Sequence, residues 1–292
     1  MISPFLNVYL MKIEKNVSKT VIYFLFLSCF VIMEIVERGV YMGNVLLARI
    51  LEYLNGTLFL NDYYRFCVFF IENYFEFYKM SLEEVSEKSH IMKESILSFL
   101  KYLGFQDYEE FQTKLYQDVI LRADQIRSRM LGLKIDDLFQ QVHMCDDQDE
   151  FMNSFDKICH DISNSRRVIL IGALYPMSIA VEFQTDLITF GKPVFQYHSY
   201  DHELVLDEDD YVIFISATGR AVSSFMNDKN HLDFSRPHSL LITQNKQYKE
   251  NMVTDDILIA PSSRHDSIDF NYRLMTIFDI LRVTYYKKYH FI

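Results

Sequence analysis

The sequence has few cysteines, and nothing in their spacing gives them a structural role. They occur without a C-x-x-C pair and without histidines at zinc-finger spacing. This argues against a disulfide scaffold and against a zinc site. We expect reduced thiols in a cytoplasmic protein, buried as small apolar side chains, at Cys29, Cys67, Cys145 and Cys159.

Positive charge is also scarce. The chain has 29 Lys and Arg against 40 Asp and Glu, a formal net charge of −11. This balance excludes attraction to nucleic acid over the whole surface, although it leaves room for a local basic face. The sequence contains no internal repeat and no low-complexity tract.

Apolar and aromatic residues are abundant by contrast. Half of the residues are hydrophobic, with 25 Phe and 20 Tyr, which is typical of a folded chain rather than a disordered one. A length of 292 residues is sufficient for two ordinary domains, each with its own core.

The N-terminal part contains a charge-free apolar run, Val21–Met33, preceded by lysines. The run is shorter than the roughly 20 apolar residues of a membrane span, and no small-residue cleavage site follows it. Three interpretations remain open. They are an over-extended translation start with the true start near Met33 or Met42, a packed helix, and a membrane anchor.

The pattern between Met42 and Ile120 predicts short helices throughout. Ser81 and Glu84 have the spacing of a capping box. A second helix has apolar residues at helical spacing before Gly104, a C-terminal cap: Ile96, Phe99, Leu100 and Leu103. Because only Ser89 to Met92 lie between the two helices, the pair indicates a helix-turn-helix whose second helix reads DNA.

The rest of the chain alternates between helices and strands. Helices are predicted over Asp107–Leu131, Phe151–Ile162, Ser178–Thr189 and Phe270–Tyr286. Strands are predicted over Val168–Ile171, Val194–Gln196, Tyr211–Ile215, Ser239–Ile242 and Ile257–Ala260. This order predicts an α/β domain with a mainly parallel sheet.

One junction in this domain carries the strongest functional signal. The apolar strand ending at Ile215 runs directly into Ser216, Thr218 and Gly219, with a helix expected from near Arg220. Open α/β sheets bind ligands at the carboxyl ends of their strands, and the start of a helix attracts anions. The alternative is that the two hydroxyls only cap the following helix.

The helix pair ending in Leu103-Gly104-Phe105, followed by this α/β domain with its S-A-T-G-R turn, resembles the RpiR family of bacterial transcription regulators. In that family the second domain is a sugar isomerase (SIS) domain. The resemblance implies an all-α DNA-binding domain at 42–122, linker helices at 123–165 and a SIS domain at 166–292, after an N-terminal extension at 1–41. It also implies a cytoplasmic homodimer or homotetramer that binds duplex operator DNA and a phosphosugar effector, with no membrane partner.

The sequence departs from the family pattern in the reading helix. Met92 replaces a capping serine and Ser98 replaces an arginine, and acidic residues outnumber basic ones over Met80–Arg122. Lost phosphate contacts lower DNA affinity. The groups left to bind DNA are Lys93, Ser95, Ser98 and Lys101. A helical domain kept for dimerisation is the competing hypothesis.

The phosphate-binding motifs also depart from the family. Of the first turn only Gly172 remains, because Leu174, Tyr175 and Pro176 follow it, and Ser178 is the residue that would compensate. In the second turn Ala221 replaces a threonine, and Arg220 offers a guanidinium instead. The phosphosugar site is therefore expected at Gly172, Ser178, Ser216, Thr218, Gly219, Arg220 and Thr243.

Two further polar groups allow other chemistry. His198, Asp201, His202 and Glu203 form one group, and His265 and Asp266 form the other. They are interpreted as solvated loop residues, with no metal and no cofactor expected. An isomerase would need a base such as His202, Glu203 or His265. We expect a sensor whose ligand shifts the spacing of two DNA-binding units, rather than an enzyme. The third possible class is a structural module that has lost its ligand.

Overall fold

A computed structural model describes most of the chain beyond residue 45. The described residues are 46–142, 148–172, 175–197, 204–220, 222, 233–251, 253–260 and 267–290. The apolar run Val21–Met33 therefore lies outside them. Within the described part, no helix combines the length and the apolar character that crossing a membrane requires.

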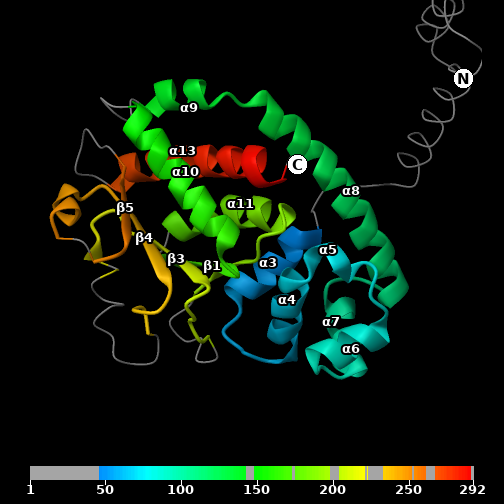
Figure 1. Cartoon of the computed structure of the whole chain (residues 1–292). Helices are drawn as coiled ribbons and strands as arrows, with labels where there is room; N and C mark the ends of the chain where they lie inside the picture. Colours follow the sequence, from blue (N-terminus) through cyan, green and yellow to red (C-terminus); the bar gives the residue numbers. More distant parts are fainter. Residues whose placement is uncertain are drawn as a thin grey trace, which may run out of the picture. The chain divides into compact units, whose positions relative to one another are not determined.

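The first half of the described chain is helical, as the sequence predicts. Its elements are α3 (Leu46–Gly56), α4 (Asp62–Glu72), α5 (Tyr74–Phe77), α6 (Leu82–Ser89), α7 (Lys93–Tyr102) and α8 (Tyr108–Gly132). Figure 1 shows α8 as a long helix that leads away from α6 and α7 towards α9. Aromatic side chains fill the core between these helices. Phe66 contacts Phe77 and Phe99 edge to face, with ring centroids 5.5 and 5.4 Å apart.

Local hydrogen bonds fix the ends of α6 and α7. The capping box is present, because the Ser81 hydroxyl accepts from the Glu84 amide and the Glu84 carboxylate accepts from the Ser81 amide. His90 then reverses the chain with a left-handed φ of 57°. At the end of α7, Gly104 has φ 97° and the Phe105 amide donates to the Leu100 carbonyl, which is a Schellman cap.

The second half contains a sheet of five parallel strands in the order β2-β1-β3-β4-β5. The strands are β1 (Arg167–Gly172), β2 (Val194–Gln196), β3 (Asp210–Ile215), β4 (His238–Thr243) and β5 (Asp256–Ile259). The predicted parallel α/β domain behind a helical segment is thus confirmed. The central strand β3 is buried along its whole length, as an apolar run with both faces covered requires.

Helices pack on this sheet and on one another. They are α9 (Ile135–Val142), α10 (Gln148–Asn164), α11 (Tyr175–Thr189) and α13 (Ser267–Tyr285), followed by a π-helical turn over Tyr286–His290. α11 contacts β1 and β2, while α13 contacts α10 and α11 (Figure 1). The apolar stripe of the last helix is buried, and Phe278 stacks on Phe183 of α11 with ring centroids 4.6 Å apart.

A buried carboxylate joins three of these helices. Asp186 on α11 is fully buried, and it accepts hydrogen bonds from Arg122 of α8 at 2.7 Å and from Arg282 of α13 at 2.9 Å. Arg282 also pairs with Glu182 at 2.9 Å. The charges of the two arginines offset part of the desolvation, which still raises the pKa of Asp186, so the loss of either partner leaves a buried charge uncompensated.

Replacing this carboxylate should destabilise the fold strongly. We expect Asp186→Asn to lower the free energy of unfolding by about 3–5 kcal/mol, because two largely buried guanidinium groups lose their counter-charge. The control is Glu76→Gln, which removes an exposed ion pair with Lys79 and should cost less than about 1 kcal/mol. Urea denaturation followed by circular dichroism measures both. Equal losses would show that the buried network does not hold the helices.

Candidate functional site

The turn after β3 is held in place by the end of β4. The Thr243 hydroxyl donates to the Ala217 carbonyl at 3.0 Å, and the Gln244 amide donates to the same oxygen at 3.2 Å. The Asn245 side-chain amide donates to the Thr218 carbonyl at 3.2 Å. Since β3 and β4 are neighbouring parallel strands, their carboxyl ends meet at one edge, and the carbonyl groups of the turn are directed to β4.

The donors of the same turn are left available. The Gly219 amide donates to the Ser216 carbonyl at 3.1 Å, whereas the amides of Ala217 and Thr218 have no acceptor among the described residues. The Arg220 Nε donates to the Thr218 hydroxyl at 3.2 Å. Two main-chain donors, a hydroxyl and a guanidinium therefore gather at one exposed turn, an arrangement that suits an anionic oxygen.

A glycine is necessary in this turn because an aromatic ring packs on it. Gly219 has φ 79°, and a Cβ atom at this position would lie 2.0 Å from the ring of Tyr248. Tyr248 belongs to the 3-10 turn η1 (Lys246–Lys249) that follows β4. Sequence reasoning did not identify this tyrosine, since a polar segment after a strand carries no signal of what it covers.

The first predicted turn contributes less than the second. Gly172 at the end of β1 lies beside Ile215, and a Cβ atom there would be 2.9 Å from the Ile215 carbonyl and 2.8 Å from the Met177 sulfur. Ser178 is exposed on α11. Among the described residues it has no hydrogen bond to the second turn. The structure thus brings together Ser216, Thr218, Gly219, Arg220 and Thr243, with Gly172 adjoining them, whereas no described hydrogen bond joins Ser178 to this group.

The residues predicted to bind DNA all lie on α7, but they differ in exposure and in the contacts that their side chains already make. Lys101 is exposed, while Lys93 forms an ion pair with Glu83 of α6. The Ser98 hydroxyl hydrogen bonds to the Tyr63 hydroxyl at 2.7 Å, and Ser95 is half-buried. Met92 occupies the N-cap of α7 without a side-chain hydrogen bond, as expected when a methionine replaces a capping serine.

A second polar cluster lies at the amino ends of the strands. Asp161 of α10, His238 of β4 and Asp256 of β5 place one ligand atom each within 4.8 Å of one another. Lys157 already donates to both carboxylates, at 3.1 Å to Asp161 and also to Asp256. Burial alone would raise the pKa of Asp256, but hydrogen bonds from Lys157 and His238 outweigh it and lower the pKa. The Lys157 ammonium group thus supplies the positive charge that the two carboxylates would otherwise take from a metal ion.

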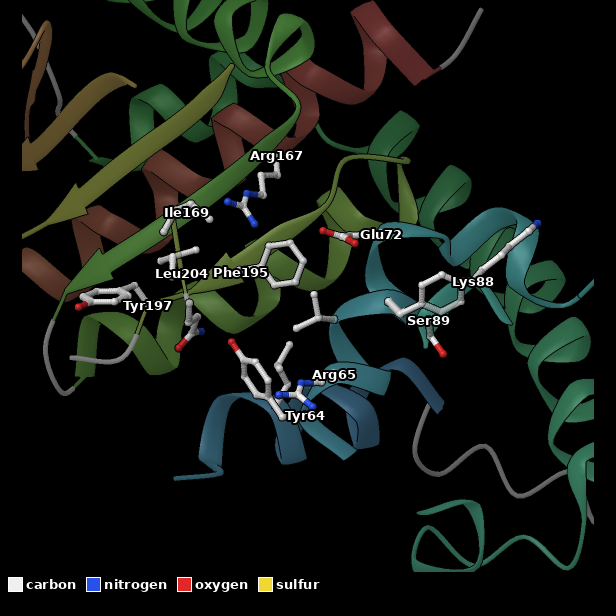
Figure 2. A pocket seen from close by; sticks show the side chains of 14 residues that line it. Tyr64, Arg65, Glu72, Lys88, Ser89, Arg167, Ile169, Phe195, Tyr197 and Leu204 are labelled. Atoms are coloured by element: carbon white, nitrogen blue, oxygen red, sulfur yellow. The ribbon is translucent and has the colours of Figure 1, made fainter. Parts of the chain in front are cut away.

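A cavity of about 360 Å³ lies elsewhere, where the helical segment meets the β1 and β2 edge of the sheet (Figure 2). Residues of α3, α4 and α6 line it on one side and those of β1, β2 and the following segment on the other. Sequence reasoning missed it, because its lining residues are scattered from Leu54 to Leu204 and share no motif.

Several residues singled out from the sequence lie outside the described part of the chain. They include both loop groups: His198, Asp201, His202 and Glu203, and His265 and Asp266. Most of the helix expected from near Arg220 also lies outside. The two described cysteines, Cys67 and Cys159, are buried free thiols as predicted, and burial raises the pKa of each.

The fold defines a parallel α/β domain joined to a helical segment, with main-chain donors that have no described acceptor at the carboxyl end of β3. The sequence matches no protein-family profile, and no curated protein sequence is significantly similar to it. The solved structures similar to it include NanR from Vibrio vulnificus complexed with ManNAc-6P, at 12% identity and TM-score 0.41, over 84% of this chain and 92% of that chain.

Two further similar structures each cover 57% of this chain. One is the sugar isomerase domain of the RpiR transcription factor from Sphaerobacter thermophilus, with 14% identity and TM-score 0.39, over 57% of this chain and 90% of that chain. The other is a hypothetical protein from Methanococcus jannaschii with an inferred function of 3-hexulose-6-phosphate isomerase. It has 16% identity and TM-score 0.40, over 57% of this chain and 90% of that chain.

The glycine in the turn after β3 should not tolerate a side chain. We expect Gly219→Ala to lower the free energy of unfolding by about 1–3 kcal/mol, because the left-handed backbone and the Tyr248 ring both oppose a Cβ atom. Gly56→Ala is the control, since nothing lies within 4 Å of its Cβ position. That change should be neutral or stabilising by about 0.5–1 kcal/mol. Thermal unfolding of both variants distinguishes them, and equal behaviour would contradict the packing at the turn.

Proposed function

We propose that this protein is a transcriptional regulator that senses a phosphosugar. The observation that carries the proposal is the turn Ser216–Arg220. There, two main-chain amides have no described acceptor, and the Thr218 hydroxyl and the Arg220 guanidinium, which hydrogen bond to each other, have further donors for a phosphate group at the carboxyl edge of a parallel sheet. The resemblance of the sequence motifs to the RpiR family supports the same assignment.

The helical segment supplies the DNA-binding half of the proposal. α6 and α7 are joined by three residues, and α7 presents Lys101 and the Lys93 side chain near its two ends. A capping box fixes the start of α6 and a Schellman cap fixes the end of α7, so α7 is a rigid element that can enter a major groove. The few basic residues make binding weak and strongly dependent on ionic strength.

The proposed mechanism couples the α/β domain to the helical DNA-binding segment within an oligomer. Binding of a phosphosugar at the turn would change the relative populations of two arrangements of a homodimer or homotetramer. Because the spacing of two reading helices must match two half-sites, a coupling free energy of roughly 1–3 kcal/mol between effector and DNA gives a usable switch. The α/β domain acts here as a sensor rather than as an isomerase.

Effector binding should depend on the turn residues. We expect the full-length protein to bind a compound from a panel of sugar phosphates that includes N-acetylmannosamine 6-phosphate, with saturation in isothermal titration calorimetry. Arg220→Gln and Thr218→Ala should each weaken that binding, by about ten-fold for Arg220→Gln, since hydrogen bonds to a charged phosphate contribute about 1.5–3 kcal/mol.

The matched control for this experiment is Arg236→Gln. Arg236 is an arginine in the same domain that pairs with Asp207 and comes just before the amino end of β4, away from the turn. Its loss should leave the affinity unchanged. If both turn variants bind as tightly as the wild type, or if no sugar phosphate binds, the sensor assignment at this turn is wrong.

DNA binding should depend on the basic residues of α7 and on salt. Lys101→Gln should reduce the slope of log affinity against log salt concentration by about 1, because one phosphate contact is lost. Lys93→Gln should have a smaller effect, since Glu83 already neutralises that ammonium. Fluorescence anisotropy with the duplex upstream of its own gene measures the slope, and Lys249→Gln on η1 is the control. Equal slopes for all variants would exclude α7 as the reading helix.

A further inference from the structure

The cavity at the β1 and β2 edge has a charge that is unusual for this protein. Three of its four charged lining residues are basic, namely Arg65, Lys88 and Arg167, and only Glu72 is acidic. The chain as a whole has a net charge of −11. Because Asp210 compensates Arg167, the positive charge that a small anion would meet is that of Arg65, which pairs with Asp62 at 3.7 Å, and of Lys88.

One side of the cavity is rigid. Arg167 donates to both carboxylate oxygens of Asp210, at 3.0 and 3.1 Å, and to the Val205 carbonyl at 2.8 Å. Its guanidinium lies over the Phe195 ring, 5.9 Å from the centroid. Asp210 is itself fixed by a second arginine, Arg166, at 3.0 Å. This wall of the cavity is therefore preorganised and does not need to be ordered by a ligand.

Glu72 faces this rigid wall without a hydrogen bond of its own. Figure 2 shows its carboxylate directed towards Arg167, across the Phe195 ring from Arg65. No ion pair or hydrogen bond of Glu72 is found in the described part of the chain. Burial raises the pKa of Glu72, while the charges of Arg167 and Arg166 oppose that rise. A partly desolvated carboxylate of this kind is stabilised by hydroxyl donors.

The remaining surface of the cavity is apolar and aromatic. Phe69, Val68 and Leu54 line it from the helices, and Phe195 and Ile169 line it from the sheet. A flat ring can pack on such a surface, and a cavity of about 360 Å³ falls within the size range of sites for small molecules. The lining thus combines cationic groups, an acceptor for hydroxyls and a face for a ring.

From these features we infer that the cavity is a second binding site, for a phosphate ester of a hydroxyl-bearing ring such as a hexose or a ribose. The phosphate lies at Arg65, the hydroxyls donate to Glu72, and the ring packs on Phe195. The site is separate from the turn after β3, and the inference does not depend on the function proposed for that turn.

A ligand in this cavity would also affect the helical segment, because the cavity lies between that segment and the sheet. The ligand contacts α4 and α6 on one side and β1 and β2 on the other. α6 is followed by α7 after only three residues. A bound ligand would therefore contact both the helical segment that carries α7 and the sheet. It should slow local unfolding of α4 and α6 together with that of β1 and β2.

The test uses the full-length protein with glucose 6-phosphate and adenosine monophosphate as probes, and glucose and adenosine as their uncharged counterparts. We expect saturable calorimetric binding of at least one phosphate and at least ten-fold weaker binding of its counterpart. Hydrogen exchange with that phosphate bound should show protection over Asp62–Glu72, Leu82–Ser89 and Val194–Gln196.

Substitutions then assign the binding to the cavity. Arg65→Gln should weaken binding at least ten-fold, and Arg65→Lys should retain part of the affinity. Lys79→Gln is the matched control, because Lys79 and Arg65 both form an exposed i,i+3 ion pair, with Glu76 and Asp62 respectively. All variants should keep the wild-type unfolding midpoint, since these exposed pairs contribute little to stability.

Three results would overturn the inference. The first is that neither phosphate binds, and the second is that the uncharged counterparts bind equally well. The third is binding that survives Arg65→Gln, is lost in Thr218→Ala, and protects only Ser216–Arg220 from exchange. That last result would place the ligand at the turn after β3 and support the sensor proposal while excluding the cavity. If both substitutions weaken binding, exchange protection over α4 and β2 supports the cavity, and its absence there excludes it.

Discussion

The arrangement of helices around the sheet depends on one buried carboxylate, Asp186. It lies on α11, which packs on β1 and β2, and it binds Arg122 of α8 and Arg282 of α13. An unpaired charge at this depth would be very unfavourable, so the three helices must come together for the carboxylate to be compensated. Because α8 continues directly from the α6 and α7 pair, this contact joins the described helical segment to α11, as does the hydrogen bond between Asn55 of α3 and Gln184 of α11.

The chemistry of the strand-end turn follows from a second constraint, the parallel direction of β3 and β4. Parallel pairing brings Thr243 and Asn245 beside the turn that follows Ile215, where they bind its carbonyl groups and leave amides of Ala217 and Thr218 for another partner. Tyr248, from the same end of β4, packs on Gly219 and makes a glycine necessary. The arrangement of donors at this turn is therefore a property of two strands and not of the S-A-T-G-R sequence alone.

Much of the fold could be predicted because its elements are coded locally. The strand Val194–Gln196 was predicted with its observed bounds, and the others differ by one residue at their ends, since uninterrupted β-branched and aromatic runs specify a buried strand. The same holds for the Ser81 and Gly104 caps of α6 and α7, which depend on residues within one or two turns. α11 begins at Tyr175 rather than at the predicted Ser178. Pro176 was read as part of a loop, but proline is well suited to the first turn of a helix.

The sequence by itself thus determined the order of helices and strands, the parallel sheet and the group Ser216 to Arg220 at a strand end. The tertiary structure alone decided which side chains meet over long distances. Asp186 and its two arginines, Tyr248 on Gly219, and the lining of the cavity join residues with no shared periodicity or motif. The physical reason is that hydrogen bonding within a helix and the alternation along a strand repeat over a few residues. Compensation of a buried charge and the filling of space depend on packing between elements that are distant in the chain.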